Sequence, residues 1–183
     1  MTQIWISEDD GKTFRIQPQR LVLSTLAQDG AGMQEPGIIE RKDGTIYLWA
    51  RTTEKYQYES YSYDGMKSFT APAPSVFDAE CSPLEIAENK DSGIWYALYN
   101  PYTIHTGKRT PLAMRISRDE GRSWSEPILI DDDENKYFHY PAMFFTKDNS
   151  VLCAYTSGDP RVLSDMVINK VGLDELESLG AEY

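Results

Sequence analysis

The stretch Ser117-Arg118-Asp119-Glu120-Gly121-Arg122-Ser123-Trp124 is a short polar turn that ends in a large aromatic residue. The same order of Ser, Asp, Gly, Ser or Thr and an aromatic residue occurs at 7–14, and a degenerate copy occurs at 62–69. The three copies begin at Ser7, Ser62 and Ser117, each 55 residues after the one before. A period near fifty residues is typical of propeller blades rather than of helical repeats.

The residue types in these three copies suit a hairpin turn. Ser and Asp side chains accept hydrogen bonds from backbone amides a few residues further on, and Gly adopts the positive φ angle that a tight turn needs. The aromatic residue starts the returning strand. We therefore expect the motif to build hairpins and to take no part in chemistry. Its residues are Ser7, Asp9, Gly11 and Phe14 in the first copy, Ser62, Asp64 and Phe69 in the second, and Ser117, Asp119, Gly121 and Trp124 in the third.

The composition narrows the class of protein. With 183 residues the chain is long enough for one domain with a sizeable core. A hydrophobic fraction of 40% and an aromatic fraction of 12% favour an all-β protein over a disordered one. The formal net charge of −11 repels the phosphates of nucleic acids and the surfaces of anionic membranes, so we expect neither as a partner.

Cys81 and Cys153 are the only cysteines, which is too few for a disulfide framework. Their spacing is not that of a metal site, and the acidic run at 131–134 lacks the alternation and the Gly of a calcium loop. We therefore expect two free thiols in or near the core, no metal and no cofactor. The sequence has no apolar run of membrane-spanning length and no basic region followed by an apolar stretch near Met1. The expectation is a soluble chain without an export signal, with the cytoplasm as the default location.

Short alternating strands bounded by turn residues run through the whole sequence, and no long amphipathic helix is present. Three strands open in the same way, with a residue before Pro, an apolar pair or triple, and a Lys-Asp turn further on. The residues before these prolines are Glu35, Ser82 and Tyr140. If the three strands are the innermost strands of successive blades, these residues lie at the rim of one central channel.

The strands predict a single partial propeller domain over 1–183. We expect a half blade at 1–30, a blade at 31–80, a blade at 81–135 and a last, incomplete blade at 136–183 that ends in a helical turn at 173–179. The expected numbers of strands are two, four, four and three. Open sheet edges leave backbone groups unpaired. We therefore expect the chain to form a homo-oligomer or to associate with a missing N-terminal half.

The turn pattern and its spacing resemble the Asp-box, or bacterial neuraminidase repeat, of the sialidase superfamily. The resemblance implies an all-β fold, with this chain as the C-terminal part of a six-bladed β-propeller. The segment from Met33 to Arg51 resembles a sialidase pattern in which a glutamate opens an inner strand and an arginine ends the next strand. Glu35 matches this glutamate, and Arg51 matches the arginine.

Two further positions resemble functional residues of that superfamily. The segment 109–117 leads into the third Asp-box, where the family places another arginine of its triad. The resemblance assigns this role to Arg109 in preference to Arg115, which lies inside the strand. Tyr140 is similar to the nucleophilic tyrosine of the family.

The chemistry of a sialoside gives each of these residues a reason. The substrate carries a carboxylate on its anomeric carbon, and guanidinium groups such as those of Arg51 and Arg109 bind carboxylates in a bidentate way that Lys cannot match. That carboxylate would repel a carboxylate nucleophile, so a neutral phenol serves better, with a glutamate to take its proton. Sialidases are exceptions to the usual pair of catalytic carboxylates in glycosidases. The resemblance thus implies Tyr140 as the nucleophile and Glu35 as its base.

The same resemblance also implies catalytic residues that have no counterpart in this sequence. The family also uses an arginine and an acid/base aspartate from its N-terminal blades, and no position here matches them, so we expect the chain alone to be inactive. Other interpretations stay open: Glu35 as a solvated rim residue, Arg51 and Arg109 as partners of surface acids, and Tyr140 as a packing residue between blades. His105 and His139 match no family position and are expected to be structural.

The sequence therefore predicts part of a sialidase-like glycoside hydrolase of the exo-α-sialidase type, acting on a terminal carboxylated sugar. The alternatives are a non-catalytic propeller module that binds acidic glycans, and a lyase or hydrolase acting on another acidic polysaccharide. In each case the expected partner is a carboxylated sugar or glycan.

Overall fold

A computed structural model describes residues 1–23, 32–102, 104, 108–159 and 162–181. Almost all of its regular structure is β-strand, as the alternating sequence pattern predicts. The strands are β1 (Thr2–Ile6), β2 (Arg15–Leu21), β3 (Gln34–Glu40), β4 (Ile46–Arg51), β5 (Tyr56–Ser62), β6 (Ala73–Asp78), β7 (Glu85–Glu88), β8 (Trp95–Tyr99), β9 (Leu112–Ser117), β10 (Ile128–Asp131), β11 (Tyr137–Thr146), β12 (Ser150–Asp159) and β13 (Val162–Gly172). They are followed by one helix, α1 (Leu173–Leu179).

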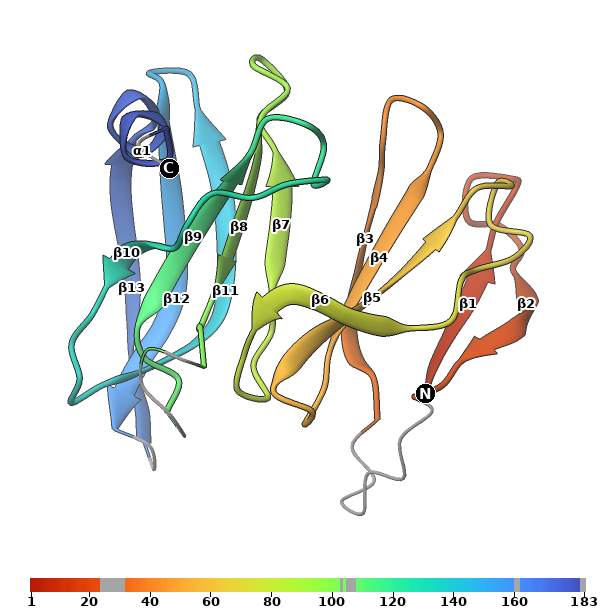
Figure 1. The fold of residues 1–183 in the computed structure, drawn as a ribbon, viewed down its shortest axis with the longest axis horizontal. Coiled ribbons are helices and arrows are strands. Elements are labelled where there is room, and N and C mark those ends of the chain that lie inside the picture. The colour runs from red at the N-terminus through yellow and green to blue at the C-terminus, as the bar shows by residue number, and fades with distance from the viewer. Residues whose placement is uncertain (24–31, 103, 105–107, 160–161, 182–183) are drawn as a thin grey trace.

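The strands form four antiparallel sheets, each built from consecutive strands. They are β1-β2, β3-β4-β5-β6, β7-β8-β9-β10 and β11-β12-β13. The expected numbers of two, four, four and three strands are therefore confirmed. Figure 1 shows the sheets following one another from the N-terminal sheet in red to the C-terminal sheet in blue. The first strands of the last three sheets are neighbours, because β7 contacts both β3 and β11.

The apolar core lies between successive sheets. In β4, Leu48 packs with Leu21 of the first sheet, whereas its neighbours Tyr47 and Trp49 pack with Trp95 of the third sheet. Successive side chains of a strand point to opposite faces, so a middle sheet with both faces covered needs apolar residues at consecutive positions. This explains why β4 is buried along nearly its whole length. Packing on both faces holds the sheets side by side as blades.

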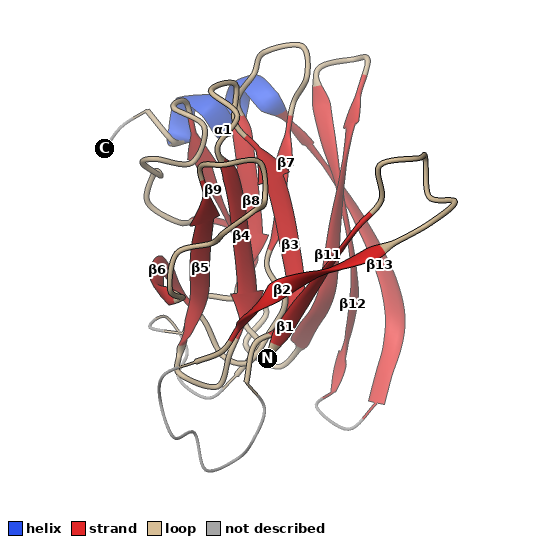
Figure 2. Ribbon diagram, turned by 90° about the vertical axis from the view of Figure 1, so that its right-hand side faces the viewer, coloured by secondary structure: helices blue, strands red, loops and turns tan. Residues whose placement is uncertain are grey.

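Helix α1 covers one end of the third interface between sheets. Leu173 and Leu176 are buried in a cluster with Leu98 of β8 and Val151 of β12. The amide of Leu173 donates to the carbonyl of Asn149, 3.0 Å away, so the helix begins beside the turn between β11 and β12 (Figure 2). The expected helical turn at 173–179 is confirmed. Within the described residues, no helix is long and apolar enough to cross a membrane.

Three strands begin later than the sequence pattern predicts, and one of them is β10, which begins at Ile128 and not directly after Trp124. A fourth strand was expected from Phe69, but β6 begins at Ala73; the Phe69 amide donates to the side chain of Gln19 in the preceding sheet (2.7 Å), and Pro72 has no amide to donate to β5. An inner strand was expected from Ser82, but β7 begins at Glu85. The Ser82 amide instead closes a tight turn onto the carbonyl of Glu80, and Pro83 has no amide to donate to a neighbouring strand.

The three Asp-boxes share one backbone conformation, which explains the degenerate second copy. In each box the fourth and fifth residues both have positive φ angles: Asp10 and Gly11, Gly65 and Met66, and Glu120 and Gly121. Consecutive left-handed residues are what tight hairpin turns require, and Gly relieves the strain at either position. The second box therefore keeps its geometry although its Gly is shifted by one place.

Hydrogen bonds within each box fix this turn. In the third box the Gly121 amide donates to Ser117 Oγ (2.7 Å), and the Ser117 hydroxyl donates to Asp119 Oδ1 (2.8 Å). The amide and the hydroxyl of Ser123 both donate to the Asp119 carboxylate, at 2.8 and 2.6 Å. The corresponding bonds around Asp64, from the hydroxyl and the amide of Ser68 above all, lower the pKa of that carboxyl to about 2.

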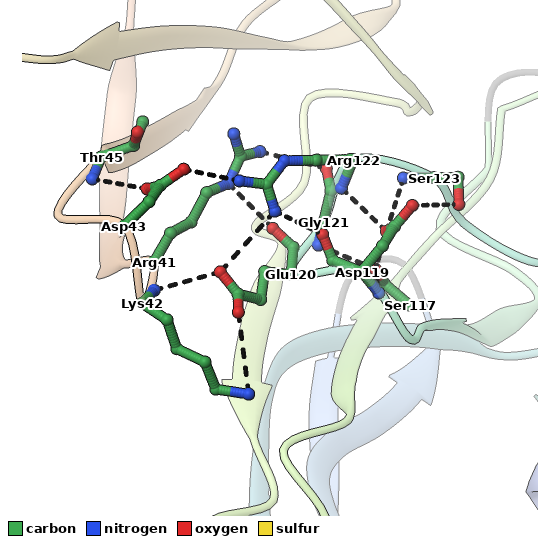
Figure 3. Close-up of polar contacts among 10 residues, drawn as sticks. All are labelled: Arg41, Lys42, Asp43, Thr45, Ser117, Asp119, Glu120, Gly121, Arg122 and Ser123. Atoms are coloured by element: carbon green, nitrogen blue, oxygen red, sulfur yellow. Dashed lines mark hydrogen bonds and ion pairs between the residues drawn. The ribbon is translucent and has the colours of Figure 1, made fainter.

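Polar side chains of one sheet bind the Asp-box of the next. Arg41 is buried and donates to the carbonyl oxygens of Glu120 (2.9 Å) and Gly121 (3.3 Å), as Figure 3 shows. Its guanidinium also lies over the rings of Tyr47 and Tyr61, 5.5 and 5.1 Å from their centroids. Gln17 and Gln19 of β2 bind backbone groups of the second box in the same manner. The boxes thus connect the sheets as well as turning the chain.

This interface predicts that substitutions at the adjacent residues Arg41 and Lys42 lower the free energy of unfolding by different amounts. Replacing Arg41 by Met removes the donors from a part-buried carbonyl oxygen of Glu120 and a buried one of Gly121, so the free energy of unfolding should fall by about 2 kcal/mol or more. Lys42→Met is the matched control, because the Lys42 side chain is 73% exposed and its ammonium lies 3.7 Å from Glu120. Its effect should be below about 0.5 kcal/mol. Urea denaturation of both variants measures the difference, and equal losses would contradict the assigned role of Arg41.

Candidate active site

Two β-bulges open the inner strands β3 and β11. The register of β3 on β4 shifts between Gln34 and Gly37, and that of β11 on β12 shifts between His139 and Ala142. Within these bulges Glu35 and Tyr140 have φ angles of 46° and 51°. A left-handed conformation at a non-glycine residue is strained, and such positions gather at functional sites. Bulges also redirect side chains out of the regular ladder.

The two bulges meet at one pocket. Its volume is about 350 Å³, and Glu35, Pro36, Gly37, Pro83, Leu84, Glu85, Tyr140 and Pro141 line it. The structure therefore brings Glu35 and Tyr140 together from strands that lie a hundred residues apart in sequence. Tyr140 is 56% exposed, so its ring is open to a ligand. All three X-Pro openings contribute to this pocket, as the repeated sequence pattern predicts.

Ser82 does not occupy the predicted position at the rim. It is fully buried, and its carbonyl accepts a hydrogen bond from Gln57 Nε2 (2.7 Å), which is also buried. Because β7 begins only at Glu85, Ser82 lies in the segment before the strand and does not have the left-handed conformation of its two counterparts. Glu85 lines the pocket in its place, and burial raises the pKa of its carboxyl. Its position between the buried Leu84 and Ile86 is the sequence signal that could have indicated it.

Arg51 ends β4 and is held by two residues of β3. Its Nη1 atom lies 3.0 Å from Glu35 Oε2, and Nε and Nη2 donate to Gln34 Oε1 at 3.1 and 2.7 Å. The Arg51 side chain is only 16% exposed, so this ion pair is better shielded from water than one on the surface. Gln34 is a site residue that the sequence did not indicate, because its role depends on the pairing of β3 with β4.

Arg109 is fixed at both its backbone and its side chain. Its carbonyl accepts hydrogen bonds from the amide of Phe138 (2.9 Å) and from Asn100 Nδ2 (3.1 Å). Its Nη1 lies 2.6 Å from His139 Nδ1, and its Nη2 donates to the carbonyl of Cys81 (2.5 Å). The guanidinium is therefore held between the segments that precede β7 and β9 and the start of β11.

The electrostatics of Arg109 connect it with the other predicted site residues. Burial lowers the pKa of its guanidinium, and the charge of Arg51 lowers it further, whereas Tyr140 and Glu35 act in the opposite direction. Arg51, Tyr140 and Glu35 thus each lie within electrostatic range of Arg109. Arg115, the less favoured alternative, instead donates from Nε to the hydroxyl of Tyr99 (2.9 Å). None of the three arginines 51, 109 and 115 is among the residues that line the pocket itself.

His139 precedes Tyr140 on β11 and contacts the same arginine. Burial, together with the charge of Arg109, lowers the pKa of its imidazole to about 4, so the ring is neutral at pH 7. The other histidine of the sequence, His105, lies outside the described residues. Across the described part of the chain, no cluster of three or more His, Cys, Asp or Glu residues could hold a metal ion.

These residues form a recognisable chemical set. Two shielded guanidinium groups, Arg51 and Arg109, provide positive charge for a carboxylate in a chain that is otherwise acidic. Beside them, an exposed phenol and a carboxylate share one pocket. The arrangement is that of a partial β-propeller with a pocket at the openings of its inner strands and two arginines near that pocket.

Comparison with known proteins identifies the family. Residues 2–153 match the sequence model of the BNR repeat-like domain, and the chain belongs to that family. A search of curated proteins found no match.

Solved structures with a similar fold include sialidases. The intramolecular trans-sialidase from Ruminococcus gnavus is 16% identical with a TM-score of 0.69, over 98% of this chain and 39% of that one. The Trypanosoma rangeli sialidase is 13% identical with a TM-score of 0.69, over 96% of this chain and 28% of that one. A protein of unknown function from Dyadobacter fermentans is 20% identical with a TM-score of 0.68, over 92% of this chain and 44% of that one. At these identities the likeness shows the fold alone, and the chain spans less than half the length of each structure.

Gly37 lies in the wall of the pocket, and we predict that it cannot be replaced by a larger residue without loss of stability. A Cβ atom at Gly37 would lie 2.1 Å from Cζ2 of Trp49, whose Nε1 donates to the carbonyl of Leu84 (2.8 Å). Gly37→Ala should therefore displace Trp49 and lower the free energy of unfolding by about 1–3 kcal/mol. Gly172→Ala is the control, because a Cβ there meets open space, and it should cost less than about 1 kcal/mol. Equal unfolding midpoints in urea for the two variants would contradict this packing.

Proposed function

We propose that this chain supplies part of the substrate site of a sialidase-type glycoside hydrolase that acts on a terminal carboxylated sugar. The observation that carries the proposal is the convergence of Glu35 and Tyr140 on one pocket, with Arg51 and Arg109 in electrostatic range. Membership of the BNR repeat-like domain family and the fold shared with sialidases support it.

In this proposal the two arginines bind the carboxylate of the sugar. The phenol oxygen of Tyr140 then attacks the anomeric carbon while Glu35 takes the phenol proton, and the glycosidic bond breaks. The leaving oxygen needs a proton from a general acid. Among the described residues, the hairpin aspartates 64, 91, 119 and 148 do not line the pocket. Glu85 does line the pocket, and burial raises the pKa of its carboxyl. We therefore propose that the acid is either Glu85 or a residue from another part of the complete propeller. Water finally releases the sugar from the tyrosine.

A non-catalytic binding module is the second candidate, and one observation favours it. Glu35 is already paired with Arg51 at 3.0 Å. The ion pair engages Oε2 of the carboxylate that would otherwise accept the phenol proton. A module that only binds an acidic glycan needs the arginines but no activated nucleophile. In either case, association of the chain with a second copy or with further blades stays a prediction.

Ligand binding tests what the two candidates share. N-acetylneuraminic acid should bind the chain in calorimetry, whereas the corresponding sugar without a carboxylate should not. Arg51→Lys and Arg109→Lys should each weaken binding by about tenfold or more, because Lys cannot form the bidentate contact. Arg115→Lys, which alters an arginine inside the sheet, is the matched control and should bind as the wild type does. Absence of binding by carboxylated sugars would contradict both candidates.

A turnover assay separates the hydrolase from the non-catalytic binding module. In a complete propeller that contains this chain, Tyr140→Phe should abolish hydrolysis of a fluorogenic sialoside and leave binding intact. Glu35→Gln should lower the rate by about a hundredfold or more, as expected for loss of a general base. Tight binding without turnover by the unaltered propeller would favour the binding module. Hydrolysis that survives both substitutions would exclude the stated mechanism.

A further inference from the structure

The contact between His139 and Arg109 has a definite direction. A guanidinium nitrogen can only donate, so His139 Nδ1, at 2.6 Å from Arg109 Nη1, must accept. The ring is therefore neutral and carries its proton on Nε2. That Nε2 atom is buried and has no hydrogen-bond partner within the described residues. A buried donor without a partner costs stability, so this imidazole is poorly explained as a purely stabilising residue.

What the ring does supply is a fixed orientation for Arg109. The guanidinium has five N–H donors. His139 engages Nη1 and the Cys81 carbonyl engages Nη2, while the Arg109 backbone is tied to Phe138 and Asn100. Two points of attachment prevent rotation of the planar group, and donors remain for a ligand. Fixing a binding group in advance reduces the entropy lost when the ligand binds.

We propose that His139 is a positioning residue for carboxylate recognition. Its neutral ring holds Arg109 in the orientation that binds the carboxylate of the sugar, and protonation of the ring in acid releases that arginine. This inference rests on the proposed function, because it assigns Arg109 to the ligand. It adds a residue that no sialidase pattern in the sequence indicated, and it gives the pocket a dependence on pH.

The groups around the ring determine the direction of this effect. Arg109 faces it from the segment before β9, and the rings of Tyr137 and Tyr140 lie 6.4 and 6.1 Å away on β11. From β12, Thr156 Oγ1 donates to the His139 carbonyl (3.2 Å), and the carbonyl of Cys81 accepts from the same guanidinium. None of these partners is a carboxylate that would stabilise an imidazolium.

Protonation would therefore be opposed and would break the contact. It would remove the acceptor at Nδ1 and place two cations beside each other. With the pKa lowered from about 6.5 to about 4, the neutral ring prevails at neutral pH. The contribution of His139 to stability is complete above about pH 6.5 and is lost as the pH falls toward 4, because the unfolded chain takes up the proton first.

Three variants isolate this role. His139→Asn keeps an acceptor near the place of Nδ1 but cannot titrate, and His139→Leu removes the acceptor. Thr156→Val is the matched control, because it removes only the hydrogen bond to the His139 backbone. The readout is the dissociation constant of N-acetylneuraminic acid, measured by calorimetry between pH 4 and pH 7.5.

At pH 7 the Leu variant should bind about tenfold more weakly, whereas the Asn variant should stay within about threefold of the wild type. The wild type and the Thr156→Val variant should lose affinity as the pH approaches 4, and the Asn variant should lose clearly less. A Leu variant that binds as the wild type does, or an Asn variant with the wild-type pH profile, would overturn the proposal.

A measurement on the free protein separates this inference from the proposed function. The ¹⁵N signals of the Arg109 side chain should shift with a midpoint near pH 4 in the wild type and should not do so in His139→Asn. If they shift in this way but no N-acetylneuraminic acid binds, the proposed function fails and the positioning contact stands. If the Arg109 signals do not change when His139 is protonated, the positioning role is wrong. This conclusion holds whether or not the chain binds N-acetylneuraminic acid.

Discussion

Packing on both faces of the middle sheets is the constraint from which the site follows. Because β4 buries alternate side chains against the first and the third sheet, the sheets must stand side by side, and their first strands β3, β7 and β11 become neighbours. The bulges at Glu35 and Tyr140 then bring both residues to the pocket where these strands open. The strain of two left-handed residues is tolerated because the surrounding packing holds them in place.

Charge balance shapes the same pocket. The chain is strongly acidic, yet Arg51 and Arg109 lie close enough for the charge of one to lower the pKa of the other. Both arginines are held by acceptors that carry no charge. Arg51 is bound by the amide oxygen of Gln34, and Arg109 is bound by the neutral imidazole of His139 and the backbone carbonyl of Cys81. Among the described residues, only Glu35 forms an ion pair with either arginine. An incoming carboxylate would compensate the excess positive charge.

The sequence predicted the parts of the structure that depend on local chemistry. Serines spaced 55 residues apart were enough to place the hairpins, and the repeated X-Pro openings were enough to bring Glu35 and Tyr140 to one pocket. Features that depend on contacts between sheets were not predictable. The carbonyl of Ser82 is bound by the buried Gln57, 25 residues away, and the role proposed for His139 depends on Arg109, 30 residues away.

The central claim is that four residues form one carboxylate site at the openings of the inner strands, namely Glu35, Arg51, Arg109 and Tyr140. A crystal structure of the protein soaked with N-acetylneuraminic acid tests it most directly. The account predicts density for the sugar in this pocket, with its carboxylate bound by Arg51 and Arg109 and its anomeric carbon facing the Tyr140 hydroxyl. Sugar bound at another surface, or Glu35 and Tyr140 opening onto different faces of the protein, would contradict it.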